Sequence, residues 1–377
     1  MPPTGSPSAL RSANLERVVG VLRSAAEVSQ AEIARRTDLA PATVSNIVRQ
    51  LVSTGLVETS GGGGRRGLTV RIARGAGLVA GLDFGHSHLE VAVGDLAGRA
   101  LVGTRRPLDN DHSHTEGLAL AEALLDDLLE ELGESREAVH AAGLGLPAPI
   151  TRDGRITAGS ILPGWVGVAA ADVASKALGM PTLVDNDANL GALAEHRDHP
   201  DVTTLAYLKV SSGIGCGLVL DGHLYRGGLG TAGELGHVTL DETGPLCRCG
   251  SRGCLEAYAG GSGLVEQLRG RMPDLAVHDL VDIAVSGDAG ARRLLEDAGR
   301  ALGQGSAILA NLLSPEAIVV GGDLACDIVV DGIRDGLRRH AVDGLGGEIE
   351  VRLSTLGDQA SVVGALVTAL DAVALPG

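Results

Sequence analysis

Aromatic residues make up only 1% of this chain of 377 residues, although apolar residues of all kinds make up 44%. Any core must therefore be packed from leucine, valine, isoleucine and alanine. No apolar run approaches the roughly 20 residues that span a bilayer, and the N-terminal residues lack the apolar centre of a signal peptide. These absences argue against a membrane partner, and we expect a soluble, cytoplasmic protein.

Cysteine is also scarce. Five cysteines, an odd number, argue against a disulfide framework in a chain of this length. Glycine is abundant, with 56 residues, which is too many for a helical bundle. Because the glycines follow no collagen period, they indicate many turns between strands and helices close to a ligand.

Negative charge dominates, and a formal net charge of −16 taken alone argues against a nucleic-acid partner. The charge is unevenly distributed, however. Residues 1–75 hold ten arginines and five acidic residues, whereas the rest of the chain holds 21 basic and 42 acidic residues. A small basic domain joined to a large acidic body suggests a DNA-binding module attached to a second function.

The basic segment has the pattern of three helices. Ser29 and Glu32 have capping-box spacing and begin a helix that ends at Thr37. Pro41 suits the first turn of the next helix, which Gly55 ends. Apolar residues at helical spacing predict the buried faces of the first and third helices: Leu15, Val18, Val19, Leu22, Val44, Ile47, Val48 and Leu51.

Short polar and cationic residues occupy the outer face of the third helix, where they can reach bases and phosphates: Thr43, Ser45, Asn46 and Arg49. Residues 56–73 predict two strands around a glycine-rich tip that carries Arg65 and Arg66. Such a wing places its arginines near the minor groove or the DNA backbone. A three-helix adaptor with solvated charges is the alternative, but the basic bias and the wing favour DNA binding.

The body contains two turns of small residues, about 130 residues apart, each following an apolar strand. An acid and glycines at such turns can hold Mg²⁺ and let backbone amides approach phosphate. Their residues are Asp83, Gly85 and Ser87 in the first turn, and Ser212, Gly213 and Gly215 in the second. The repetition predicts a duplicated α/β fold with a cleft between two lobes. Near the C-terminus, a buried strand runs into Gly321 and Gly322, which suit the packing of a nucleotide.

Asp187 lies between the two turns, where a strand passes into a helix. A carboxylate at that junction can accept the proton of a sugar hydroxyl during phosphoryl transfer. Equally, Asp187 and the preceding Asn186 can cap the helix by accepting hydrogen bonds from its first amides. The two roles are compatible.

Three of the five cysteines fall within eight residues. His237, Cys247, Cys249 and Cys254 form a set of one imidazole and three thiolates, which is a closed tetrahedral site for structural Zn²⁺. Reduced thiols without a metal are the alternative. Glu234 and Glu256 bracket this set, so we expect the metal to hold both carboxylates where they accept hydrogen bonds from a sugar; solvated surface acids are the alternative.

Together these residues resemble the ROK family (repressors, open reading frames, kinases), in its regulator form with an N-terminal winged helix-turn-helix. The resemblance covers nearly the whole chain, and its most specific part is the glutamate-glycine-histidine segment and the cysteine cluster. It implies a two-lobed, actin-like or hexokinase-type (ribonuclease H-like) body assembled as a homodimer or homotetramer. We expect a winged helix at 1–75, an N-terminal lobe at 76–190 and a C-terminal lobe at 191–377, with the last helix packing back on the first lobe.

The resemblance also implies functions for individual residues. It gives sugar contacts to Asn186, Asp187, Glu234, His237 and Glu256, with Asp187 as the general base of a kinase. It gives ATP and Mg²⁺ to the two turns and to Gly321 and Gly322. Family kinases carry a second glycine where this chain has His86. The leading hypothesis is a regulator that binds an operator and responds to a sugar or sugar phosphate; the alternative is an ATP-dependent hexose or N-acetylhexosamine kinase.

Overall fold

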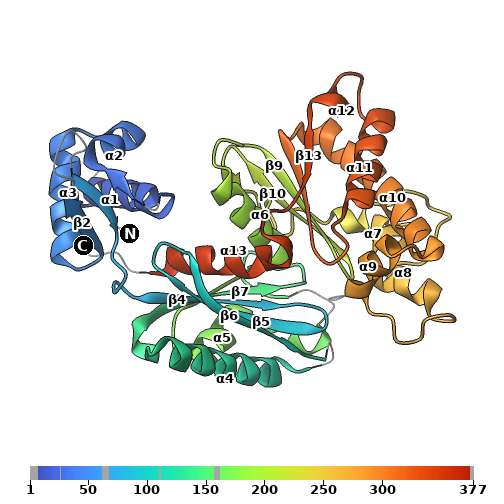
Figure 1. Cartoon of the computed structure of the whole chain (residues 1–377), viewed down its shortest axis with the longest axis horizontal. Coiled ribbons are helices and arrows are strands. Elements are labelled where there is room, and N and C mark those ends of the chain that lie inside the picture. Colours follow the sequence, from blue (N-terminus) through green and yellow to red (C-terminus); the bar gives the residue numbers. More distant parts are fainter. Residues whose placement is uncertain (1–6, 26, 62–67, 110–111, 157–161, 374–377) are drawn as a thin grey trace.

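The computed structural model describes residues 7–25, 27–61, 68–109, 112–156 and 162–373. They form a small N-terminal head and a body of two lobes (Figure 1). Each lobe is built on a five-stranded sheet. In the described residues, no helix combines the length and apolar character needed to cross a membrane.

The head is a winged helix. Its helices are α1 (Pro7–Arg23), α2 (Gln30–Thr37) and α3 (Pro41–Ser53), and its strands are β1 (Val28–Ser29), β2 (Val57–Gly61) and β3 (Leu68–Ile72) in the antiparallel order β1-β3-β2. The eight apolar residues that the helical spacing predicted to be inside are all buried. The first helix begins earlier than its apolar pattern indicated, and β1 was not predicted.

The capping box expected at α2 is only half formed. Ser29 is the N-cap and accepts a hydrogen bond from the backbone N–H of Glu32. The Glu32 side chain does not return to Ser29 but pairs with Arg35 and Arg36 at 2.6 and 2.7 Å. Two arginines one turn ahead thus compete successfully with a single backbone amide for this carboxylate.

The first lobe is a sheet in the order β6-β5-β4-β7-β8, covered on its outer face by α4 (His114–Leu132) and α5 (Ala170–Leu178). Its strands are β4 (Leu78–Phe84), β5 (His88–Asp95), β6 (Ala100–Pro107), β7 (Val139–Leu146) and β8 (Thr182–Asn186). Strands β4, β7 and β8 run parallel, so their carboxyl ends meet at one edge. Ligands of open α/β sheets bind at such an edge.

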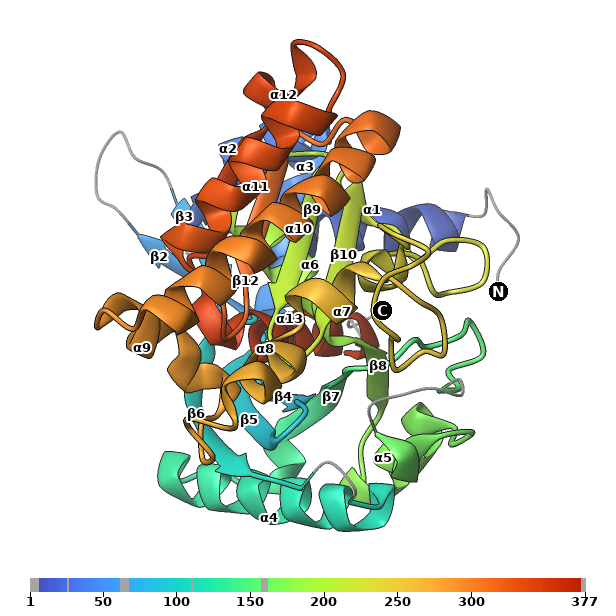
Figure 2. The same cartoon turned by 90° about the vertical axis from the view of Figure 1, so that its right-hand side faces the viewer.

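The second lobe is a sheet in the order β11-β10-β9-β12-β13. Its strands are β9 (Leu205–Val210), β10 (Ile214–Leu220), β11 (His223–Leu224), β12 (Ala317–Gly321) and β13 (Glu350–Leu353). Alternate residues of β9 face opposite layers: Ala206 and Leu208 pack against the outer helices, while Leu205 and Tyr207 pack against α6 (Asp187–Asp198). Figure 2 views this lobe from outside, with its outer helices nearest the reader: α7 (Leu255–Ala259), α8 (Gly261–Leu268), α9 (Leu280–Val285), α10 (Ala289–Leu313) and α11 (Asp327–His340).

Two helices lie between the lobes. Helix α6 packs on β9 and β10, and α13 (Ala360–Ala369) packs on α6 and on β4 and β7 of the first sheet. The last helix therefore returns to the first lobe, with one end toward the head (Figure 1). A Cβ at Gly364 would lie 1.9 Å from the carbonyl oxygen of Leu190, so α6 and α13 touch backbone to backbone. The expected lobe boundary at residue 190 falls inside α6.

Candidate functional site

A cavity of about 210 Å³ lies between the lobes. It is lined by the turn after β4, the β8–α6 junction, the β9–β10 turn and the segment around the cysteine cluster. All five residues expected to contact sugar line it: Asn186, Asp187, Glu234, His237 and Glu256. The sequence separates these residues by up to 70 positions, and the fold brings them to one cavity.

Asn186 and Asp187 lie at the junction between β8 and α6. Asn186 is the N-cap of α6, and its Oδ1 accepts from the backbone N–H groups of Ala188 and Asn189 at 2.9 and 3.3 Å. Asp187 begins the helix with 6% of its surface exposed. Burial raises the pKa of Asp187, against the opposing effect of Lys209. The capping role and a place in the cavity thus coexist, as the sequence allowed.

Glu256 lies in the first turn of helix α7 and accepts three hydrogen bonds. Arg248 donates two hydrogen bonds to it, from Nε to Oε1 at 2.7 Å and from Nη2 to Oε2 at 2.6 Å. The backbone N–H of Ile214 also donates to Oε2, at 3.0 Å. Arg248, which lies between two of the predicted metal ligands and lines the cavity, was missed at the sequence level.

Glu234 precedes a single 3-10 turn that ends at His237. Burial, followed by the charges of Glu256 and Asp187, raises the pKa of Glu234 to about 7. Its side chain is still 40% exposed, on the cavity side, so the carboxyl group is accessible to a ligand. Glu234 Oε2 lies 3.9 Å from Nε2 of His237.

The predicted metal ligands form one cluster. The ligand atoms of His237, Cys247, Cys249 and Cys254 all lie within 4.8 Å of one another. The Sγ atoms of Cys249 and Cys254 are 3.7 Å apart, as are Cys247 Sγ and His237 Nδ1. A tetrahedral ion with metal–sulfur bonds of about 2.3 Å separates its ligands by about 3.8 Å. The four side chains can therefore hold a metal ion.

Only some of the residues expected to bind ATP and Mg²⁺ line the cavity. Gly85, Ser212, Gly213 and Gly215 line it, whereas Asp83, Ser87, Gly321 and Gly322 do not. Asp83 is buried behind the wall and Ser87 is exposed. Gly321 has a packing reason to be glycine, since a Cβ there would lie 2.2 Å from the hydroxyl of Tyr207.

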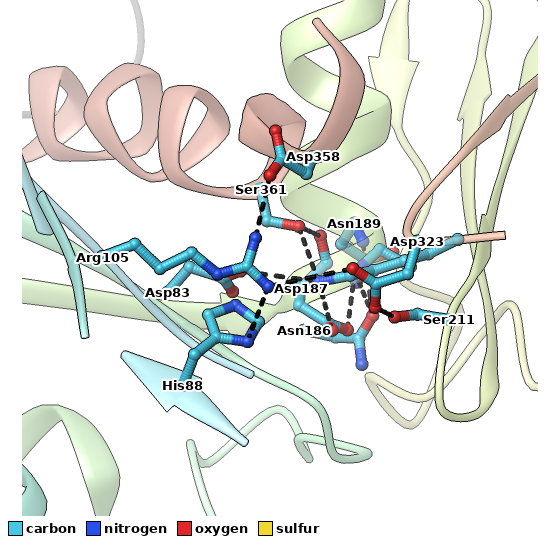
Figure 3. A network of polar contacts seen from close by, with 12 residues as sticks. Asp83, His88, Arg105, Asn186, Asp187, Asn189, Ser211, Asp323, Asp358 and Ser361 are labelled. Carbon is cyan, nitrogen blue, oxygen red and sulfur yellow. Dashed lines mark hydrogen bonds and ion pairs between the residues drawn. The ribbon is translucent and has the colours of Figure 1, made fainter. Parts of the chain in front are cut away.

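Charged residues that the sequence analysis missed fill the space around these turns. Lys209, at the end of β9, lies 2.8 Å from Asp187 and 3.5 Å from Asp83. Arg105 on β6 reaches His88 and two acids, as Figure 3 shows. A lysine in the otherwise apolar segment LAYLKV, directly before a phosphate-type turn, was the signal available for Lys209.

The candidate DNA-binding residues lie on α3 as predicted. Asn46 and Arg49 are exposed, with Arg49 Nη1 3.2 Å from Asn46 Oδ1, while Thr43 and Ser45 are half-buried. Strands β2 and β3 form the expected antiparallel wing. Its arginines, Arg65 and Arg66, lie outside the described residues.

Sequence comparisons match this architecture. The profile of the ROK family matches residues 79–372 and that of the MarR family matches residues 17–66. The chain is 27% identical to the xylose repressor of Bacillus subtilis (strain 168) over 357 residues, covering 91% of each protein. It is 27% identical to the DNA-binding transcriptional dual regulator NagC of Escherichia coli (strain K12) over 385 residues, covering 96% of this chain and 93% of the relative.

Solved structures of ROK-family proteins have a similar fold. A ROK-family transcriptional regulator, a homolog of the E. coli Mlc protein, has a TM-score of 0.79 at 25% identity, covering 97% of this chain and 96% of that one. The ROK-family glucokinase of Streptomyces griseus, solved with glucose and AMPPNP, has a TM-score of 0.69 at 28% identity and covers 78% of this chain and 100% of its own. A winged-helix head and a sugar-kinase-like α/β body, with a family match over most of the length, lead to one conclusion: this chain belongs to the ROK family.

Proposed function

We propose that the protein is a sugar-responsive transcriptional regulator of carbohydrate metabolism, acting in the cytoplasm on a double-stranded DNA operator. The observation that carries the proposal is helix α6, which begins in the cavity at Asp187 and ends at the head. There Arg197 donates a hydrogen bond to the backbone carbonyl of Arg23, the last residue of α1, at 3.1 Å. Twelve helical residues span about 18 Å as one rigid rod.

The cavity favours a small, polar ligand. Its volume of about 210 Å³ is below the about 300–1,000 Å³ of sites for drug-sized molecules. Acidic and amide side chains line it, and these accept hydrogen bonds from hydroxyl groups. A sugar or sugar phosphate held by Asn186, Asp187, Glu234, His237 and Glu256 fits these properties, and the repressor names of the full-length relatives support a sugar as effector.

Zn²⁺ is the ion that we propose for the cysteine cluster, because three thiolates and one imidazole leave no open position for water. His237 would bind the ion through Nδ1, which faces Cys247, and leave Nε2 directed toward Glu234. The ion would then be structural, fixing the segment from which Arg248 and Glu256 enter the cavity.

The head would act in pairs. Winged-helix and helix-turn-helix proteins bind pseudo-palindromic sites as dimers, with recognition helices about 34 Å apart. We therefore propose a homodimer or a homotetramer. A sugar that shifts α6 would change the spacing of the two heads and so the affinity for the operator. The kinase alternative, with Asp187 as general base, is less well supported, because the relatives matched over more than nine tenths of their length are named as a xylose repressor and a DNA-binding transcriptional dual regulator.

Binding to DNA upstream of its own gene tests the proposal. We expect affinity for this DNA to exceed that for random DNA of equal length, to fall steeply with salt, and to change when one sugar of a panel is added. Equal affinity for both DNAs at every salt concentration would contradict the regulator. A sugar-dependent release of ADP from ATP would instead support the kinase.

A further inference from the structure

Asp83 and Asp187 are the carboxylates that would hold Mg²⁺ and activate a sugar hydroxyl in a kinase. In this chain a third side chain stands between them. Lys209 Nζ lies 2.8 Å from Oδ2 of Asp187 and 3.5 Å from Oδ2 of Asp83. It also donates a hydrogen bond to Ser361 Oγ at 3.0 Å, and Ser361 donates in turn to the backbone carbonyl of Asp187.

The ammonium group of Lys209 compensates the negative charge of two buried carboxylates. Asp83 and Asp187 are 1% and 6% exposed, and two neighbouring buried carboxylates destabilise each other unless a cation separates them. Burial alone would lower the pKa of Lys209, but the charges of Asp187 and Asp83 outweigh burial and raise it above its ordinary value. Lys209 is therefore a cation at neutral pH.

Mg²⁺ does not fit this arrangement. The ion requires oxygen ligands in octahedral geometry at about 2.0–2.1 Å. A part-buried ammonium at 2.8 Å from the carboxylate of Asp187 fills that coordination space, supplies no lone pair and repels a second cation. Lys209 would have to leave both aspartates before a metal could bind them.

The surroundings of the first turn are equally unsuited to phosphate. A Cβ at Gly85 would lie 2.1 Å from the imidazole ring of His88, so the histidine already covers the glycine. Burial, and then the charges of Arg105 and Lys209, lower the pKa of His88 to about 4, which leaves the ring uncharged at neutral pH.

Arg105, a further cation beside this turn, already has partners. Its guanidinium lies 3.0 Å from His88 Nδ1, 2.8 Å from Asp358 and 3.8 Å from Asp323 (Figure 3). Asp323 directly follows Gly322, where a nucleotide was expected, and also accepts a hydrogen bond from Ser211. The contacts of Arg105 thus cross from the first lobe to the second, and a phosphate would have to displace two carboxylates to pair with this guanidinium.

We infer that Lys209 is a built-in counter-ion that replaces the divalent cation between Asp83 and Asp187, so that the cavity binds its ligand without Mg²⁺ or nucleotide. The inference rests on the proposed function only for the identity of that ligand as a sugar. The replacement of the metal is independent of it.

The experiment compares full-length wild type with Lys209→Met, which keeps most of the length of the unbranched side chain and removes the charge. Thermal unfolding is measured with MgCl₂, with MgCl₂ and AMPPNP, and with NaCl at matched ionic strength. We expect no Mg²⁺-specific change for wild type. For Lys209→Met we expect a lower melting temperature that Mg²⁺ raises by several degrees, because the metal then binds two uncompensated carboxylates.

A double variant guards against failure to fold. Lys209→Met with Asp83→Asn keeps the net charge of the three groups, and should fold and be insensitive to Mg²⁺. Stabilisation of wild type by Mg²⁺ and AMPPNP would overturn the inference. A folded Lys209→Met variant that Mg²⁺ does not stabilise would also overturn it, as would a double variant that Mg²⁺ stabilises as much as it stabilises Lys209→Met. Absence of sugar binding to wild type would instead count against the proposed function, since the Mg²⁺ measurements require no sugar.

Discussion

Arg197, near the end of α6, makes a polar contact between the body and the head. Its guanidinium donates to the backbone carbonyls of Gly98 at 2.9 Å and of Ala97, both in the first lobe, and to that of Arg23 at 3.1 Å. The Arg23 carbonyl belongs to the last turn of α1, where carbonyl groups lack helical partners. Arg197→Met would keep much of the apolar stem and remove all three donors.

The expected effect of Arg197→Met on operator affinity can be estimated from the hydrogen bond of Arg197 that reaches the head, the one to the carbonyl of Arg23. A hydrogen bond from a charged group contributes about 1.5–3 kcal/mol. If sugar binding makes or breaks this bond, Arg197 can account for a change in operator affinity of about ten- to 150-fold. Coupling free energies between sites usually fall in the same range. The variant should therefore lose most of the response to sugar while retaining sugar affinity.

The assay is operator binding with and without saturating sugar, for wild type, Arg197→Met and the control Arg99→Met. Arg99 lies near the same turn and bonds to Asp95, within the first lobe. We expect the ratio of the two dissociation constants to approach one only in Arg197→Met. A wild-type ratio in that variant, with sugar binding intact, would refute transmission through the end of α6.

Three further predictions concern the metal, the DNA and pH. Chelation, or Cys254→Ser, should remove one Zn²⁺ per chain and lower the melting temperature, whereas Cys326→Ser, away from the cluster, should leave metal content unchanged in elemental analysis. Arg49→Ala should weaken DNA binding for all sequences and reduce the salt slope by about one, which filter binding at several salt concentrations would detect. Burial, with Asp83 and Asp358 nearby, raises the pKa of Glu90 from 4.5 to about 7, so the folded state is progressively destabilised as pH rises through this window. Glu90→Gln should remove that loss, giving up to about 3 kcal/mol of added stability at pH 8 and little at pH 5 in denaturant unfolding, and parallel pH curves would contradict this.

The head was predictable because its signals are local. Helical spacing placed Val44 and Leu51 inside, and Pro41 marked the first turn of α3, all within a few residues of the contacts concerned. The early start of α1 was missed because residues 7–14 carry little of the apolar period that identifies its buried face.

The charged interior of the cavity was not predictable in the same way. Lys209 meets Asp83 across 126 positions and Ser361 across 152, and Arg105 meets Asp358 across 253. No local pattern encodes such pairs, since a lysine in a strand acquires its partner only when the lobes assemble. The glycine turns led to the correct fold. A glycine indicates only the conformation of the backbone, however, and does not indicate which charged side chain packs beside the turn.

Glu256 illustrates how the structure refines a prediction made from spacing. A carboxylate has about four lone-pair positions, and Arg248 with the Ile214 amide uses three of those of Glu256. One position remains for a sugar hydroxyl while Arg248 stays in place. Glu234, whose ion-pair partner among the described residues is His237 at 3.9 Å, keeps more of its acceptors available. The two acids that bracket the cysteine cluster are therefore unequal: Glu256 mainly orients Arg248 and the β9–β10 turn, and Glu234 is the better acceptor for a ligand.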